Sequence, residues 1–286
     1  MKLFKSLVGN TPLIEISEGI YGKLETYNPT GSVKDRVIYY LVSKAILSGE
    51  ITSGAILCEA TSGNTGIALS ACAASLGLKC RIFMPSNMSA ERKSMMNLYG
   101  AELVYSDPSD FTGAIELRDR FLETNNSWSP LQFSNPNNII CHKTTTAPEI
   151  HKNLIDLNLN WGAFIHGSGT GGTIEGVRQY VEQEKIETKV CMVQPLECFH
   201  GIQGIGDGKD FLADPENMSS TIKISTEAAI NRAKKFASDT GILVGVSSGA
   251  NMLASEKWRQ ENPGDTIVTM LCDRGERYMS VYGDIP

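Results

Sequence analysis

The chain has 286 residues, a formal net charge of −6 and a pI near 5.4, and 41% of its residues are apolar against 20% charged. This is ordinary globular composition, and the length suits one large or two medium domains. The acidic balance argues against a nucleic-acid partner, which would need a basic face. Neither a run of eighteen apolar residues nor a leader-like N-terminus is visible, so we expect a cytoplasmic protein without membrane contact.

Cysteine and histidine patterns do not indicate a metal site. The seven cysteines are scattered and never stand in C-x-x-C spacing, so we expect reduced and mostly buried thiols. The histidines lie in no metal-binding pattern and are interpreted as structural or surface residues: His142, His151, His166 and His200. We therefore predict no metal ion.

The first informative element is the turn at residues 28–31, "NPTG", which precedes an apparent helix. Ser32 is placed to cap that helix, so Lys34 would fall in its first turn. The positive end of a helix dipole is an unfavourable place for a cation. A surface lysine beside Asp35 is the ordinary interpretation, and the rest of the chain must decide whether Lys34 has another role.

A glycine-rich turn follows the apolar run at residues 55–60, which we expect to be a strand. The turn reads Thr61-Ser62-Gly63-Asn64-Thr65-Gly66 and leads into a helix of small residues. Hydroxyls, an amide and bare glycine backbone at a helix N-terminus form a nest for an anion. A tight turn explains the glycines but not the polar residues between them.

Short apolar runs and amphipathic segments alternate along the whole chain. Further strands are expected at residues 80–85, 101–105, 162–167, 189–194, 242–246 and 266–272, and helices at 89–99, 113–122, 172–183 and 226–239. This alternation predicts parallel sheets covered by helices on both faces. The polar stretch at residues 125–138 is the best candidate for a crossing between two domains.

The second glycine-rich turn, "GSGTGG" at residues 167–172, satisfies G-x-G-x-x-G between a strand and a helix. A dinucleotide site would also need an acidic residue at the end of the next strand, where this chain has Gln194. The hydroxyls of Thr170 and Thr173 suit a terminal phosphate instead. We predict a phosphate cup. A phosphorylated aldehyde cofactor, bound to Lys34 and facing a substrate carboxylate, would use the cup, the nest and the lysine together.

With these residues the chain resembles the pyridoxal-phosphate (PLP)-dependent cysteine synthase (O-acetylserine sulfhydrylase) and cystathionine β-synthase family, of the tryptophan-synthase-β-like fold. The resemblance runs almost end to end, through "VGNTPL", "NPTGSVKDR", "EATSGNTGIAL", "QFSNPNN", "TTTAPEI", "GSGTGGT", "QGIG", "GVSSGAN" and "CDRGERYMS".

The resemblance implies an α/β fold of type II, with two three-layer domains of mostly parallel twisted sheets and PLP bound in the cleft between them. Residues 36–140 would form the smaller domain, which carries the substrate-carboxylate loop. Residues 1–35 and 141–286 would form the larger domain, which carries the PLP lysine and the phosphate-binding loop.

The resemblance also implies residue roles. Lys34 matches the lysine that forms the Schiff base with PLP and moves the substrate's α-proton. Asn64 would contact the cofactor's ring hydroxyl, and Ser247 its pyridine nitrogen, a partner that leaves the ring largely unprotonated. The phosphate would be held by Gly169, Thr170, Gly171, Gly172 and Thr173. The substrate carboxylate would be held by Thr61, Ser62, Gly63, Asn64, Thr65 and Gln132.

The implied reaction is a β-replacement on an amino acid: O-acetyl-L-serine and sulfide give L-cysteine and acetate through an aminoacrylate intermediate. The alternatives are an L-cysteine β-lyase that releases hydrogen sulfide, a cystathionine β-synthase and, from another class, a non-catalytic PLP-binding regulatory partner. The implied partners are an amino-acid substrate, sulfide or a thiol, and a second copy of the chain in a homodimer.

One departure from the family pattern falls near the expected chemistry. After "QGIG" the family continues with an apolar or small residue, whereas this chain has Asp207 and, two positions on, Lys209. Gly-Asp-Gly is common turn chemistry. If Asp207 instead reaches the site, its carboxylate would act as a general base at the β-carbon and favour the conversion of cysteine to serine and sulfide.

Overall fold

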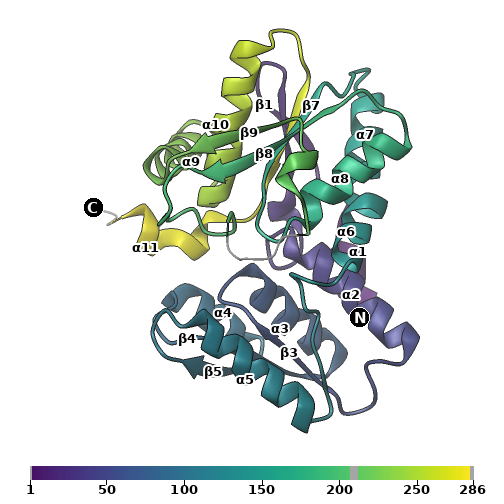
Figure 1. Cartoon of the computed structure of the whole chain (residues 1–286), viewed down its shortest axis with the longest axis vertical. Coiled ribbons are helices and arrows are strands. Elements are labelled where there is room, and N and C mark those ends of the chain that lie inside the picture. Colours follow the sequence, from purple (N-terminus) through teal and green to yellow (C-terminus); the bar gives the residue numbers. More distant parts are fainter. Residues whose placement is uncertain (1, 207–211, 284–286) are drawn as a thin grey trace. The chain divides into compact units, whose positions relative to one another are not determined.

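The computed structural model describes residues 2–206 and 212–283, so Asp207 and Lys209 lie outside the described part of the chain (Figure 1). Contacts group the chain into two compact units. The smaller unit comprises residues 1–8 and 28–131, and the larger unit comprises residues 9–27 and 132–286. Each unit is described by itself.

The smaller unit is built on a four-stranded parallel sheet of order β5-β4-β3-β6. Its strands are β3 (Ile56–Ala60), β4 (Lys79–Pro85), β5 (Glu102–Ser106) and β6 (Ser127–Trp128). Its helices are α1 (Lys2–Leu7), α2 (Lys34–Ser48), α3 (Asn64–Leu76), α4 (Ala90–Leu98) and α5 (Phe111–Thr124).

The strand order places helices on both faces of this sheet. The chain moves one way from β3 through β4 to β5 and then returns to β6, and right-handed crossovers put α3 and α4 on one face and α5 on the other. Successive residues of each strand point to opposite faces of the sheet, so each face has its own hydrophobic core. Leu57 and Ile82 pack with α2 and α3, whereas their neighbours Cys58 and Phe83 pack with α5.

The larger unit has a six-stranded sheet of order β1-β2-β10-β7-β8-β9, in which only the β1–β2 pair is antiparallel. Its strands are β1 (Leu13–Ser17), β2 (Ile20–Leu24), β7 (Ala163–Gly167), β8 (Lys189–Pro195), β9 (Ser220–Ile224) and β10 (Ile267–Leu271). Its helices are α6 (Asn137–Cys141), the π-helix η2 (His142–Thr146), α7 (Ala147–Asp156), α8 (Gly172–Gln183), α9 (Thr226–Thr240), α10 (Val246–Glu261) and α11 (Met279–Tyr282). Short 3₁₀ turns are η1 (Glu25–Tyr27), η3 (Pro215–Asn217) and η4 (Gly275–Tyr278).

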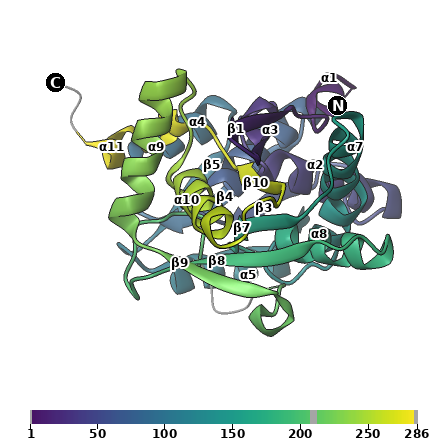
Figure 2. The same cartoon turned by 90° about the horizontal axis from the view of Figure 1, so that it is seen from above.

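The two faces of this sheet also carry different helices. The chain moves outward from β7 to β8 through α8 but back from β9 to β10 through α9 and α10, so right-handed crossovers place these helices on opposite faces. Helices α9 and α10 contact each other and lie side by side in Figure 2. Ala163 and Ile165 of β7 and Phe236 of α9 belong to one buried cluster there.

Most of the expected elements are present, and the α/β class with mostly parallel sheets is confirmed. The strand expected at residues 242–246 is wrong. Val244 makes a single isolated bridge with Arg274, and Val246 already begins α10. β-Branched residues suggested a strand, but the extended backbone lasts only to Gly245, whose N–H bonds the carbonyl of Asp273, before α10 begins at Val246.

The boundaries of the two units differ from those expected. Contacts group Lys34 with the smaller unit, whereas the expected boundaries assigned it to the larger domain. The reason is packing: Ile38 and Val42 of α2 are fully buried in the same cluster as Ile67 of α3.

All seven cysteines are free, and every one except Cys198 is buried, as expected. None of the helices in the described part of the chain has the length and apolar character that a bilayer crossing requires.

Candidate cofactor and substrate site

The predicted phosphate loop joins the carboxyl end of β7 to the start of α8 in the larger unit. Backbone atoms of a neighbouring segment lie close to two of its glycines, Gly169 and Gly171. A Cβ atom at Gly169 would lie 2.4 Å from the carbonyl oxygen of Gly204, and one at Gly171, where φ is +86°, would lie 2.5 Å from the nitrogen of Ala213. Side chains are therefore excluded, and the loop presents backbone at a helix N-terminus, whose first N–H groups have no intrahelical acceptor.

Thr170 is held by hydrogen bonds from two donors. The side-chain nitrogen of Asn138 lies 3.1 Å from Thr170 Oγ1, and the backbone nitrogen of Gly172 lies 3.3 Å from the same oxygen. Asn138 also donates to the backbone carbonyl of Gln132 at 3.0 Å. The structure thus ties Gln132, predicted to bind substrate, to the phosphate loop through one buried amide.

Thr173, in the first turn of α8, faces the buried imidazole of His142. Its Oγ1 lies 3.2 Å from His142 Nε2, and Nδ1 of the same ring lies 2.8 Å from Thr146 Oγ1. Both His142 and Thr146 belong to the π-helix η2 and are almost fully buried. π-Turns are rare and often mark functional sites.

Glu175, one turn into α8, brings a negative charge close to this loop. Burial alone would raise the pKa of its carboxyl, but hydrogen bonds from Arg178 and Gln179 together hold that pKa below its ordinary value. Arg178 NH2 lies 2.8 Å from Glu175 Oε1. The ion pair neutralises the carboxylate and so limits its repulsion of a bound anion.

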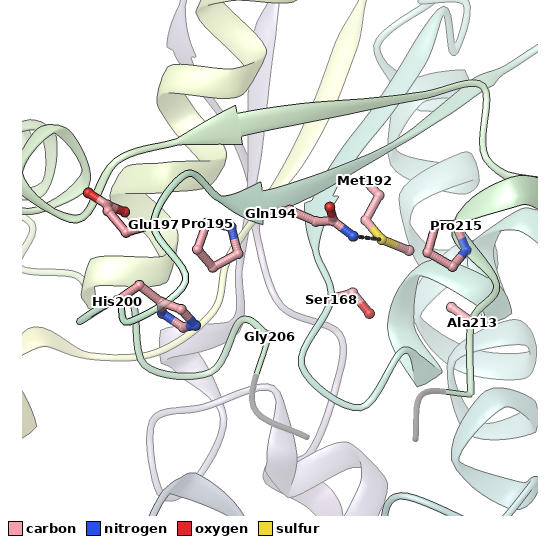
Figure 3. A pocket seen from close by; sticks show the side chains of 9 residues that line it. All are labelled: Ser168, Met192, Gln194, Pro195, Glu197, His200, Gly206, Ala213 and Pro215. Carbon is pink, nitrogen blue, oxygen red and sulfur yellow. Dashed lines mark hydrogen bonds between the residues drawn. The ribbon is translucent and has the colours of Figure 1, made fainter. Parts of the chain in front are cut away.

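A pocket of about 260 Å³ lies beyond the carboxyl end of β8 in the same unit (Figure 3). Its lining includes Ser168 of the phosphate loop, Gln194, Glu197 and His200. Gln194 donates to the sulfur of Met192, and Glu197 accepts from the backbone N–H of Thr226 at the start of α9. Among the described lining residues, the carboxylate of Glu197 therefore supports the start of α9.

Ser247 lies in the first turn of α10 and is 5% exposed. The neighbouring Ser248 accepts a hydrogen bond from the backbone nitrogen of Cys272 at 2.9 Å, which fixes the helix start against the end of β10. The first turn of α10 is therefore a rigid support for the Ser247 hydroxyl.

In the smaller unit, the predicted carboxylate nest follows β3 and opens α3. The backbone nitrogen of Thr61 donates to the carbonyl of Phe83 on the adjacent strand, and the nitrogen of Gly63 donates to Thr61 Oγ1 at 3.3 Å. A Cβ atom at Gly63 would meet nothing within 4 Å, so the loop has open space beside it. Ser62 and Asn64 are half-buried.

Lys34 is the first residue of α2, as predicted, and is half-buried. The cap expected from Ser32 is wrong: Val33 occupies the N-cap position and no side chain caps the helix. Asp35 orders the turn instead, because its carboxylate accepts from the backbone nitrogen and the hydroxyl of Thr30 at 2.8 and 2.6 Å.

A terminal phosphate fits the loop at residues 169–173. The loop offers backbone N–H groups and two threonine hydroxyls, and its glycine positions have no room for a side chain. No group of three histidine, cysteine, aspartate or glutamate side chains within residues 2–206 and 212–283 is arranged to hold a metal ion.

An α/β fold with a phosphate cup, a hydroxyl-rich anion nest and a lysine at a helix start defines a class of enzymes that use a phosphorylated cofactor. The chain belongs to the family of pyridoxal-phosphate-dependent enzymes, whose family model matches residues 4–273. PLP is therefore its cofactor, and the residues of the cup could hold its phosphate.

Known proteins of three activities are similar over almost the whole chain. Cysteine synthase B from Campylobacter jejuni is 38% identical over 289 residues, which cover 96% of this chain and 95% of that protein. A hydrogen sulfide-producing enzyme from Fusobacterium nucleatum has a TM-score of 0.90 at 33% identity, with 96% and 97% coverage. An O-acetylserine-dependent cystathionine β-synthase from Helicobacter pylori has a TM-score of 0.88 at 34% identity, with 97% and 96% coverage.

Sequence reasoning assigned no role to Asn138, His142 or Thr146. The stretches "QFSNPNN" and "TTTAPEI" carried the family resemblance, and His142 was interpreted only as a structural or surface histidine. The sequence shows these three only as polar residues without an evident role, because the partners of Asn138 and His142 lie about thirty positions away, at Thr170 and Thr173. Thr146 contacts the ring of His142.

Proposed function

We propose that the chain is a cysteine synthase, which converts O-acetyl-L-serine and sulfide to L-cysteine and acetate. The observation that carries the proposal is the phosphate cup at residues 169–173 in a chain that also places Lys34 at a helix start and a hydroxyl-rich loop at residues 61–65. The 38% identity to cysteine synthase B over nearly the full chain supports this choice of reaction.

The proposed cofactor contacts are those that the family resemblance implies. Gly169, Thr170, Gly171, Gly172 and Thr173 would hold the phosphate, Asn64 the ring hydroxyl, and Ser247 the ring nitrogen. When bound, PLP supplies an electron sink that makes the substrate's α-proton acidic. A hydroxyl at the ring nitrogen makes that sink weaker than a carboxylate would, which suits elimination and replacement at the β-carbon.

Lys34 is proposed as the residue that links to the cofactor and moves the α-proton. Its amine lies at the positive end of α2, where the helix dipole disfavours the ammonium form and so favours a nucleophilic amine. The two hydrogen bonds from Thr30 to Asp35 support this role, because they hold in place the turn that precedes Lys34.

The substrate carboxylate is proposed to bind the nest at residues 61–65 with help from Gln132. Backbone N–H groups at the start of α3 and the hydroxyls of Ser62 and Thr65 offer charge-assisted hydrogen bonds. The tie from Asn138 to the backbone of Gln132 supports a fixed position for that residue.

A sulfide-releasing reaction on cysteine is the second candidate. It is favoured by the similarity to the hydrogen sulfide-producing enzyme, and it would also be favoured by Asp207 if that carboxylate reaches the site and acts as a general base at the β-carbon. A cystathionine-forming reaction, suggested by the Helicobacter pylori relative, is the third.

Product analysis tests the proposal. The purified protein is incubated with O-acetylserine or cysteine, each with and without sulfide or homocysteine, and Lys34→Ala serves as the matched control. We expect cysteine from O-acetylserine plus sulfide as the fastest reaction, and no turnover in the control. Faster sulfide release from cysteine alone would replace the proposal with the second candidate, and absence of any turnover would favour a non-catalytic PLP-binding partner.

We also propose a cytoplasmic homodimer that contacts neither nucleic acid nor membrane. Seven free cysteines suit a reducing compartment, and twofold pairs are the commonest assemblies of such chains. Light scattering at low concentration should give twice the mass of one 31.1 kDa chain. A mass near that of one chain would refute the dimer.

A further inference from the structure

We propose that two buried residues behind the phosphate loop are positioning residues that decide which way its threonine hydroxyls point. Asn138 does so for Thr170, and His142 does so for Thr173. The inference rests on the proposed function, in which the loop at residues 169–173 holds the cofactor phosphate, and it adds the reason why that loop accepts an anion.

The orientation of Asn138 follows from its partners. One atom of its amide lies 3.0 Å from the backbone carbonyl oxygen of Gln132, and a carbonyl oxygen can only accept. That amide atom is therefore the NH₂ group, and its second hydrogen is donated to Thr170 Oγ1 at 3.1 Å.

Thr170 Oγ1 consequently receives two hydrogen bonds, from Asn138 and from the backbone N–H of Gly172. A hydroxyl oxygen has two lone pairs, so both are occupied. The hydroxyl of Thr170 can then only donate its own hydrogen, and such a donor suits an anion.

His142 can act on Thr173 in two ways, because a neutral imidazole has one N–H and one lone pair. If Nδ1 carries the hydrogen, Nε2 takes the Thr173 hydroxyl hydrogen, and that hydroxyl offers the phosphate only lone pairs. If Nε2 carries the hydrogen, Thr173 accepts from the ring and keeps its own hydrogen for the phosphate. The Thr146 hydroxyl then donates to Nδ1, so Thr146, His142 and Thr173 all donate in one direction.

The local structure brings Thr146, His142 and Thr173 together. In η2 the hydroxyls of Thr144 and Thr145 turn back to backbone carbonyls four residues earlier, which leaves Thr146 for the ring. Gly176 lets α8 approach, because a Cβ atom there would lie 2.7 Å from His142 Cβ. Gly176 is one turn after Thr173, so this close contact brings the hydroxyl to the imidazole.

The closing experiment measures selectivity for the phosphate. Equilibrium dissociation constants are determined for PLP and for pyridoxal, which lacks the phosphate, in the wild type and in Asn138→Leu, His142→Phe and His142→Gln. We expect the leucine and phenylalanine variants to bind PLP about tenfold more weakly or worse, as for a lost hydrogen bond to a charged group, with pyridoxal affinity unchanged. His142→Gln should recover part of the loss, because its amide can still donate to Thr173.

His151→Phe is the matched control. His151 lies in the same unit, and its ring bonds the hydroxyl of Tyr180 instead of the phosphate loop. Its PLP to pyridoxal selectivity should equal that of the wild type. An equal loss of PLP and pyridoxal affinity in the Asn138 and His142 variants would reduce both residues to general structural roles and overturn the inference.

The tautomer gives an independent test that needs no core truncation. Nitrogen-15 NMR of the PLP-loaded wild type should find the His142 ring hydrogen on Nε2. A hydrogen on Nδ1 would overturn the assignment. A wild type that binds PLP no better than pyridoxal would instead refute the phosphate cup, and with it the proposed function.

Discussion

At the scale of single residues, the two proposed anion sites differ in the burial of their hydroxyls. The phosphate cup has its hydroxyls buried, with Thr170 and Thr173 each 6% exposed, whereas Ser62 of the nest is half-buried beside open space. A permanent cofactor group suits the first environment, and a substrate that must enter and leave suits the second. The difference makes the roles of the two sites separable by mutation.

Ser62→Ala should weaken apparent substrate affinity and leave cofactor retention unchanged. One charge-assisted hydrogen bond to a carboxylate contributes about 1.5–3 kcal/mol, so the KM for the amino acid should rise by roughly tenfold or more. Steady-state kinetics and the PLP content of the purified variant provide the measurement.

Ser75→Ala is the control, because Ser75 lies near the other end of α3 and its hydroxyl donates to the carbonyl of Cys72. Its KM should match the wild type. If Ser62→Ala loses PLP yet keeps the wild-type KM, the two anion sites have been assigned the wrong way round.

Thiol reactivity should differ sharply between cysteines. Burial raises the pKa of Cys58, Cys72 and Cys80 to about 12, whereas Cys198 is exposed. Because the thiolate is the reactive form, iodoacetamide at pH 8 should modify Cys198 in the native protein and the other three only after denaturation. Peptide mass spectrometry measures this order, and rapid native modification of Cys58 would contradict the buried β3 strand.

At the scale of elements, the contact between α8 and η2 depends on a missing side chain. A Cβ atom at Gly176 would lie 2.7 Å from the carbonyl oxygen of Ile139 and 2.9 Å from the nitrogen of Lys143, and backbone atoms of a neighbouring helix cannot yield cheaply. The glycine thus sets how closely the first turn of α8 approaches His142.

Gly176→Ala should therefore destabilise the protein by about 1–3 kcal/mol, although alanine is ordinarily the better helix former by about 1 kcal/mol. It should also weaken PLP binding, since Thr173 would move away from His142. Urea unfolding and PLP titration give the two numbers.

Gly66→Ala in α3 is the comparison for stability. A Cβ atom there would meet the flexible end of Met96 at 2.8 Å, so the neighbour can move and the cost should be smaller. A Gly176→Ala protein as stable as the wild type would show that the close contact between α8 and η2 is not required.

At the scale of the whole molecule, stability should depend on pH through the Glu175–Arg178 ion pair. The folded state holds the pKa of Glu175 below its ordinary value of 4.5. The pair therefore stabilises the protein fully above that value and loses its contribution as the pH falls through the lower folded-state pKa.

Glu175→Gln should lower the free energy of unfolding by about 1 kcal/mol near neutral pH, after allowance for the partly exposed Arg178. Urea unfolding between pH 7 and strongly acidic pH should show the difference from the wild type shrinking toward the acid end. Glu182→Gln is the control, because its side chain is 72% exposed and should contribute little. A Glu175→Gln effect that is constant across this range would exclude the charge as its cause.

The sequence by itself determined the class of the fold and much of the candidate site. Alternating strand and helix patterns fixed the α/β class, because periodicity and turn chemistry are local properties. The glycine and threonine content of residues 167–173 predicted an anion loop, and the resemblance of whole motifs predicted PLP. The helix start at Lys34 was also predicted, although the cap predicted from Ser32 was wrong.

Only the tertiary structure decided the features that depend on pairs distant in sequence. It grouped Lys34 with the smaller unit, because α2 packs on α3. It also showed that residues 242–246 lead into helix α10 instead of forming a strand. It also set Asn138 and His142 behind hydroxyls some thirty positions further along the chain. Local patterns carry no information about such partners, since the direction of a hydroxyl hydrogen is set by whichever donors and acceptors the packed fold brings beside it.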